Sequence, residues 1–144
     1  MPLAIAVTAI AFNTINGSIN GIFLAEAWFY SSYVCLIAGG CLFGLGMGLN
    51  LVSDNRLLAL RKPGESGYTL PRGGFFERVT SPNLLGEILE WWGFFIAAPS
   101  WASLSFSIWT MANLVPRARD HHHWSRQYFA DYPKNRKILF PYLW

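Results

Sequence analysis

The residues best able to do chemistry lie between positions 50 and 93, where acids, arginines, glycines and amides separate two hydrophobic stretches. Asn50, Asp54 and Arg61 are spaced so that all three share one face of a helix. An amide and a carboxylate can hydrogen-bond hydroxyls or a carboxamide, and an arginine can hold a phosphate. An Asp–Arg pair can equally be a structural anchor at a membrane interface. The pattern leaves a ligand site and a structural pairing both open.

A glycine-punctuated segment follows this helix. Pro63-Gly64 is a helix stop, and the chain up to Gly74 reads as an ordered loop with one aromatic residue, Tyr68. The run Arg72-Gly73-Gly74 lets backbone amides and a guanidinium approach an anion closely, although so short a motif is a weak signal.

Ser81-Pro82 then favours a new helix, because a serine cap is followed by a first-turn proline. Asn83, Glu87 and Glu90 form one polar stripe on that helix, whose other faces are Leu, Ile and Trp. Unpaired carboxylates are costly near lipid. The stripe therefore favours a ligand site or a buried pairing over a solvated face.

The last polar cluster runs from Arg117 to Trp124 and contains His121, His122 and His123. Neighbours on a helix point about 100 degrees apart, so three consecutive histidines cannot all bind one ion. We expect no metal site. A cationic rim that binds phosphate, with one histidine as donor, suits these residues better.

Composition and charge show which elements must position these groups. The chain is 53% hydrophobic, 17% aromatic and only 13% charged, which is typical of a protein whose solvent is the bilayer. Every Lys and Arg falls within 56–78 or 117–137. If both blocks face the cytosol, the apolar stretch 84–115 must leave that face and return, which predicts a helical hairpin broken near Pro99-Ser100. The net charge of +3 favours phosphate-bearing ligands or lipid headgroups over nucleic acid.

The predicted fold is an all-α integral membrane protein with about four transmembrane or membrane-embedded helices, a cytosolic loop and short C-terminal helices. We expect Gly40, Gly44 and Gly48 to form a ridge on which another helix packs closely. The chain reads as one domain, 1–144, with these segments: helix 1–25, helix 28–61, loop 62–81, helical hairpin 82–115 and cytosolic tail 116–144.

The chain resembles the C-terminal region of the membrane steroid 5-alpha-reductases (3-oxo-5-alpha-steroid 4-dehydrogenases). The resemblance extends over essentially the whole chain and is strongest from Asn50 onward. It rests on ordered blocks: N-x-x-S-D at 50–54, LRKPG at 60–64, GY-x-x-P-x-GG-x-F at 67–76, N-x-x-GE-x-x-EW at 83–91, and R-A-x-x-HH with DYPK-x-RK at 117–137.

This resemblance implies a multi-pass enzyme of the endoplasmic reticulum membrane, with its cofactor side cytosolic, that uses NADPH to reduce the 4,5 double bond of 3-oxo-4-ene steroids. The family's acid and phenol lie upstream of the matched region, so no catalytic residue is assigned here. Apolar walls for the steroid would come from Trp91, Trp109 and Leu114, whose alternative role is ordinary packing. The family's cofactor contacts map onto Asn50, Asp54, Arg61, Tyr68, Asn83, Glu87, Arg117, His121 and Arg136.

Three positions depart from the family pattern. Many relatives carry an arginine where this chain has Leu58, a basic residue at Thr69 and a tyrosine at Ser125. The alternatives are a trans-2-enoyl-CoA or polyprenol reductase of the same fold, or a truncated form that binds cofactor, or pairs with a full-length reductase, without turnover. The expected partners are a steroid or sterol-like lipid and membrane lipids, with no nucleic acid.

Overall fold

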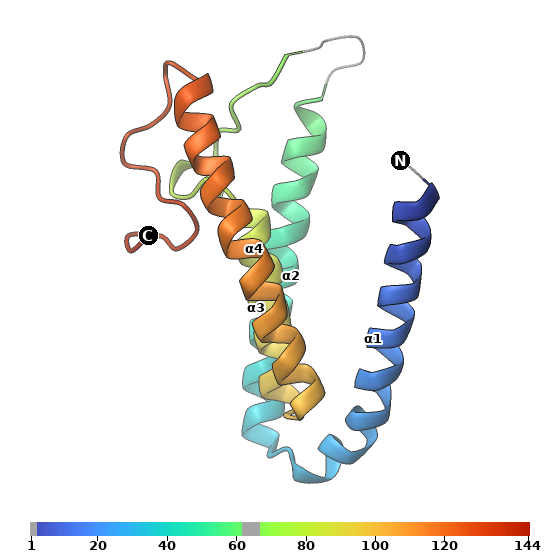
Figure 1. The fold of residues 1–144 in the computed structure, drawn as a ribbon. Coiled ribbons are helices and arrows are strands. Elements are labelled where there is room, and N and C mark those ends of the chain that lie inside the picture. Colours follow the sequence, from blue (N-terminus) through green and yellow to red (C-terminus); the bar gives the residue numbers. More distant parts are fainter. Residues whose placement is uncertain (1–2, 62–66) are drawn as a thin grey trace.

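The computed structural model describes residues 3–61 and 67–144, and the side chains of residues 26–30 are left out of the description. Four long helices dominate the described chain (Figure 1): α1 (Leu3–Tyr30), α2 (Tyr33–Ala59), α3 (Pro82–Ala97) and α4 (Trp101–Tyr128). A short 3-10 helix, η1 (Gly74–Glu77), precedes α3. The all-α prediction with about four helices is confirmed. The predicted helix stop at Pro63-Gly64 lies outside the described residues.

The first two helices meet later in the chain than the sequence indicated. We expected one helix over 1–25 and the next over 28–61, whereas the break falls at Ser31 and Ser32. The Ser32 hydroxyl accepts a hydrogen bond from the Cys35 amide at 3.2 Å and so caps α2. The apolar character of the segment continues through this cap, which is why hydrophobicity alone misplaced the boundary.

The predicted hairpin is present, and its turn lies between Ala98 and Ser100. Ser100 and Ser103 form a reciprocal capping box that starts α4. The second arm differs from the prediction, because α4 continues through Pro116 to Tyr128 and residues 129–144 contain no helix. At 1.5 Å per residue α3 is about 24 Å long and α4 about 42 Å. Because α4 is longer than α3, the histidines at 121–123 lie beyond the level at which α3 begins.

Glycines bring α2 and α3 into close contact, but not the glycines that we expected. A Cβ on Gly40, Gly44 or Gly48 would meet nothing within 4 Å, so the predicted ridge is wrong. Instead Gly46 faces Gly86 and Gly39 faces Gly93. The pairs lie two helical turns apart on each helix, which lets the antiparallel backbones touch twice. The buried apolar core lies beside this contact and contains Leu84, Leu85, Ile88, Leu114, Ala118 and Leu139.

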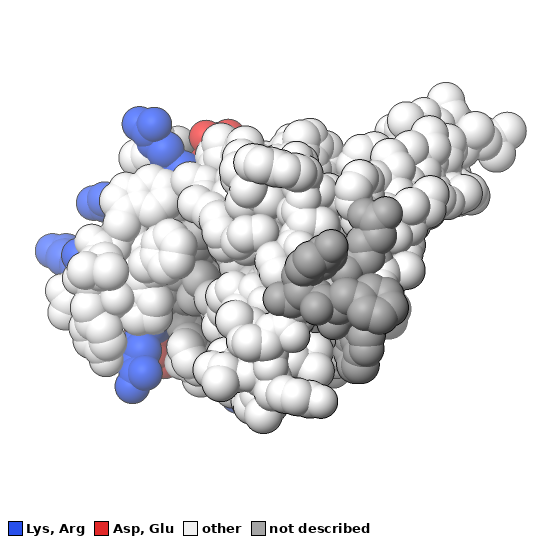
Figure 2. Space-filling view, turned by 90° about the horizontal axis from the view of Figure 1, so that it is seen from below, with Lys and Arg blue, Asp and Glu red and all other residues white. Residues whose placement is uncertain are grey.

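Two helices, α1 and α2, are long and apolar enough to cross a membrane. Only 6% and 11% of their apolar stretches are buried inside the structure, so most of that surface requires an apolar surrounding. Seen from the end where the helices turn back, the molecule is largely uncharged, and charged residues show only along one side (Figure 2). This exposed apolar surface is that of a membrane protein.

Candidate functional site

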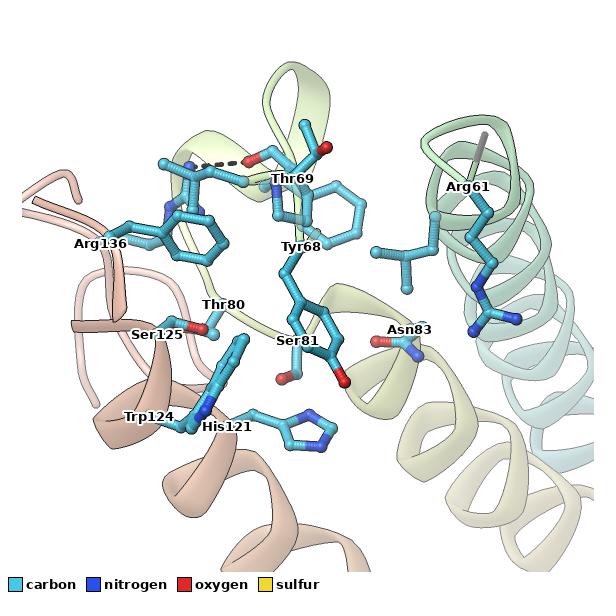
Figure 3. Close-up of a pocket in the computed structure, with 15 residues that line it drawn as sticks. Arg61, Tyr68, Thr69, Thr80, Ser81, Asn83, His121, Trp124, Ser125 and Arg136 are labelled. Atoms are coloured by element: carbon cyan, nitrogen blue, oxygen red, sulfur yellow. Dashed lines mark hydrogen bonds between the residues drawn. The ribbon is translucent and has the colours of Figure 1, made fainter. Parts of the chain in front are cut away.

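A cavity of about 440 Å³ opens at the end of the bundle where α2 and α4 finish and α3 begins. Figure 3 shows Arg61 and Asn83 on one side of it, His121 and Trp124 from α4 on another, and Arg136 across from Arg61. The volume is in the range of small-molecule and cofactor sites. Its lining consists of Leu57, Arg61, Tyr68, Thr69, Leu70, Pro71, Phe76, Thr80, Ser81, Asn83, His121, Trp124, Ser125, Phe129 and Arg136.

The segment 67–81 forms one wall of the cavity and is held in place at its middle and near its C-terminal end. Gly73 and Gly74 have φ of 86° and 57°, a conformation that favours glycine, and the Arg56 guanidinium packs against both. Near the C-terminal end of the segment, Val79 forms a parallel bridge with Lys137. The tail is thereby tied to the wall, which brings Arg136 to the cavity.

Arg136 is the most unusual residue of the site, because it is a cation with only 3% of its surface exposed. Its Nη2 donates to the Pro71 carbonyl at 3.1 Å, and its guanidinium lies 5.1 Å from the centroid of the Tyr132 ring. Its Nε is buried and lacks a hydrogen-bond partner within the described residues. Burial lowers the pKa of Arg136, and the nearby Glu77 carboxylate and Tyr132 offset that effect only in part. A phosphate or carboxylate would supply both the missing acceptor and the counter-charge.

Aromatic and imidazole groups complete the cavity opposite Arg136. Tyr68 meets Trp124 edge to face, with ring centroids 4.9 Å apart, and projects toward His121 in Figure 3. Burial and the nearby Arg117 charge lower the pKa of His121, which favours a neutral imidazole at neutral pH. The cavity therefore combines one buried cation with flat apolar faces.

The nine predicted cofactor residues divide into two groups. Five of them line the cavity, namely Arg61, Tyr68, Asn83, His121 and Arg136. The other four lie outside its lining. Asp54 accepts a hydrogen bond from Asn83 Nδ2 at 3.1 Å, and Asn50 packs against Gly86. Glu87 lies within electrostatic reach of Asp54 and Arg117.

The three predicted substrate residues do not share one cavity. Trp109 lines an apolar groove of about 530 Å³ between α1 and α4. Trp91 lies outside the lining of this groove. Its ring contacts Phe106, which does line the groove, with ring centroids 4.2 Å apart. Leu114 is 8% exposed and belongs to the core between α3 and α4.

Several lining residues were not predicted as site residues. Thr69 and Ser125, noted only as departures from the family pattern, both face the cavity. The lining residue Thr80 was missed, and so was His122, which lies behind the lining against Thr80. The signal for His122 is its helical spacing, because Leu114, Ala118 and His122 recur every four residues and all three are buried. Of the three histidines, only His122 therefore continues the packed face of α4.

The bundle has two apolar helices of membrane-spanning length and a cationic, aromatic cavity at one end. This combination is that of a membrane protein with a ligand-sized cavity. The chain belongs to the 3-oxo-5-alpha-steroid 4-dehydrogenase family, because the sequence profile of that family matches residues 1–144.

Individual relatives agree with the family match. The chain is 46% identical to "Steroid 5-alpha-reductase DET2" of Solanum lycopersicum, over 99% of this chain and 57% of the relative. It is 44% identical to "3-oxo-5-alpha-steroid 4-dehydrogenase 1" of Mus musculus, over 95% of this chain and 55% of the relative. The human protein of the same name is 42% identical, over 99% and 57%. The chain thus spans little more than half the length of these relatives.

Proposed function

We propose that this chain forms the NADPH-binding part of an enzyme that reduces the 4,5 double bond of 3-oxo-4-ene steroids. The observation that carries the proposal is Arg136, a buried guanidinium beside the cavity whose Nε has no partner in the described chain. A buried cation is costly unless a charged acceptor completes it. A phosphate of a dinucleotide is such an acceptor.

The rest of the lining supports a dinucleotide better than a simple anion. Arg61 adds a second cation, and Tyr68 with Trp124 offers aromatic faces for a planar ring. Asn83, oriented by Asp54, offers an amide to a carboxamide or hydroxyl. When bound, NADPH supplies the hydride for reduction. The residues of this chain bind it and orient it.

The substrate part of the proposal rests on the family and on the apolar groove. The names of the relatives describe steroid reduction, which favours a steroid over an enoyl-CoA or a polyprenol. Trp109 and Phe12 wall the groove with apolar rings 4.8 Å apart. Trp109 precedes His121 by three helical turns, or about 18 Å along α4. Cofactor and steroid would therefore meet between these two levels of the helix. We place the protein in the endoplasmic reticulum membrane with the cavity toward the cytosol.

Cofactor binding is tested by titrating the purified 144-residue chain in detergent with NADPH and following energy transfer from tryptophan. Arg136→Gln should weaken binding by about 2 kcal/mol or more, or roughly 30-fold, the scale for losing a charge-assisted contact. Arg119→Gln removes the same charge from an exposed position of α4 and should leave the affinity unchanged. If NADPH binds saturably and neither substitution changes its affinity, Arg136 is not part of the site. If NADPH does not bind the unmodified chain, the proposal is overturned.

Turnover is measured separately, in microsomes that express the chain and receive NADPH with a 3-oxo-4-ene steroid. Formation of the saturated 3-oxo product by the chain alone would place a proton donor within these residues. Product only when the upstream part of a relative, inactive by itself, is co-expressed would fit a cofactor-binding part. If NADPH binds but no 3-oxo-4-ene steroid is reduced under either condition, the steroid assignment fails while the cofactor assignment stands.

A further inference from the structure

Three side chains from distant parts of the chain meet beside the cavity. Thr80 Oγ1 lies 2.6 Å from His122 Nδ1 and 2.6 Å from the Tyr132 hydroxyl, and that hydroxyl lies 3.1 Å from the same Nδ1. Thr80 precedes α3, His122 belongs to α4, and Tyr132 belongs to the tail. This Thr80–His122–Tyr132 network therefore joins three segments. The segment before α3 and the tail are also linked by Arg72 to Asp131 and by Arg136 to Pro71, but among the described residues only this network links them to α4 through polar side chains.

The network is connected to Arg136 through the Tyr132 ring. The Arg136 guanidinium lies over that ring, and the ring's hydroxyl is fixed by Thr80 and His122. The backbone is fixed as well, because the Thr80 amide donates to the Lys137 carbonyl at 2.9 Å and the Lys137 amide donates to the Arg78 carbonyl at 2.8 Å. Arg136 is thus held by its neighbour in sequence and by the ring on which it lies.

We propose that the Thr80–His122–Tyr132 network is a positioning device that holds the Arg136 guanidinium against the anion-binding cavity. The inference rests on the proposed function, since it assigns these three residues to the same cofactor site. They act through Arg136 and need not touch the ligand. Without the network the Tyr132 ring can turn, and a guanidinium that is free to swing into water gains solvation and leaves the cavity.

The electrostatics around His122 suit this role. Burial lowers the pKa of His122, and the charges of Arg126, His123 and Arg136 lower it further. The Nδ1 of a neutral imidazole can hydrogen-bond one of these hydroxyls, which in turn bonds the other, without placing a second positive charge beside Arg136. Within the part of the chain that the structure describes, the Tyr132 phenol is the only other ionisable group in direct contact with the ring.

Two substitutions at one position separate hydrogen bonding from packing. His122→Phe keeps a ring but removes the Nδ1 contact, and we expect NADPH affinity to fall about tenfold, the scale of a lost buried hydrogen bond. His122→Asn keeps a polar atom near the Nδ1 position and should restore the affinity to within about threefold of the original. His123→Phe, at an exposed neighbour, is the matched control and should change nothing. Equal affinities for the Phe and Asn variants at position 122 would overturn the proposal.

A double-mutant cycle tests whether the network works through Arg136. In a chain that already carries Arg136→Gln, adding His122→Phe should cost no further affinity, because the residue it positions is gone. A further tenfold loss would show that His122 acts elsewhere. If His122→Phe does not fold, Tyr132→Phe replaces it in the cycle, since it removes one hydroxyl and keeps the ring.

A ligand-free measurement separates this inference from the proposed function. Arg136 is buried, so it should resist an arginine-specific dicarbonyl reagent, with modification read by mass spectrometry. Tyr132→Phe or His122→Phe should make it reactive, and His122→Asn should keep it protected. An Arg136 that stays protected in both Phe variants would overturn the positioning role even if NADPH binds. An Arg136 released as expected in a chain that does not bind NADPH would confirm positioning while the cofactor assignment fails.

Discussion

Gly46 and Gly86 meet backbone to backbone, and a Cβ on either residue would lie 2.6 Å from the carbonyl oxygen of the other. No side chain fits that space without separating α2 from α3. The contact fixes the start of α3, and with it Asn83, relative to the polar end of α2. The geometry of the cavity therefore depends on a pair of glycines outside it.

Replacing Gly46 with leucine should destabilise the protein by about 3 kcal/mol or more, because the clash is with backbone that cannot move aside. The measurement is thermal unfolding of the detergent-solubilised chain. Gly44→Leu is the matched control on the same helix, where a Cβ meets nothing within 4 Å and helix propensity improves. A similar loss of stability in both variants would argue against close packing at Gly46.

Arg61 lines the cavity from the end of α2, so Arg61→Ala should weaken NADPH binding by about 2 kcal/mol, the scale of a lost charge-assisted contact. Arg61→Lys, which keeps the charge but not the planar fork, should recover part of that loss. Isothermal titration of the two variants beside the unmodified chain provides the comparison. Unchanged affinity in the alanine variant would remove Arg61 from the site.

Stability should fall in mild acid. Burial lowers the pKa of both His121 and His122 in the folded chain below the ordinary histidine value of about 6.5. As pH falls below about 6.5, the unfolded chain takes up protons that the folded chain resists, so the free energy of unfolding decreases. Melting temperatures between about pH 7.5 and about pH 5.5 should show this drop, and His122→Asn should reduce it. An unchanged slope in that variant would mean that His122 does not contribute.

The hairpin predicts which chain segments share a side of the membrane. Both the segment before α3 and the tail after α4 lie at the cavity end, whereas Pro99 lies at the opposite turn. Accessibility reporters at Gly67 and Trp144 should both read cytosolic, and a reporter at Pro99 should not. Opposite readings for Gly67 and Trp144 would exclude the hairpin orientation.

Sequence reasoning identified the helices because long apolar runs and a Pro-Ser break depend on local chemistry. It chose the wrong glycine face on α2, since that choice is made by the partner helix. Gly86 and Gly93 lie seven residues apart, and only Gly39 and Gly46 match that spacing. The regular interval of Gly40, Gly44 and Gly48 was the more visible pattern and the less relevant one.

The candidate site was predicted in part for a similar reason. Arg61, Asn83 and His121 lie near helix ends, where sequence spacing constrains what they can reach. Arg136 came only from the family resemblance, and its burial follows from the bridge between Val79 and Lys137. His122 was not separated from its two neighbours, because the face that it occupies becomes evident only when α4 is followed back to Leu114.

The bridge between Val79 and Lys137 also bears on how the protein is made. Arg61 and Arg136 stand on opposite sides of the cavity and are separated by 75 residues of chain (136 − 61). A ribosome adding about 5–20 residues per second needs roughly 4–15 s to cover that distance. Until then one wall of the cavity does not exist, so a nascent chain cannot be stabilised by a ligand bound in it. The early helices must instead rely on the lipid and the membrane insertion machinery until synthesis reaches the tail.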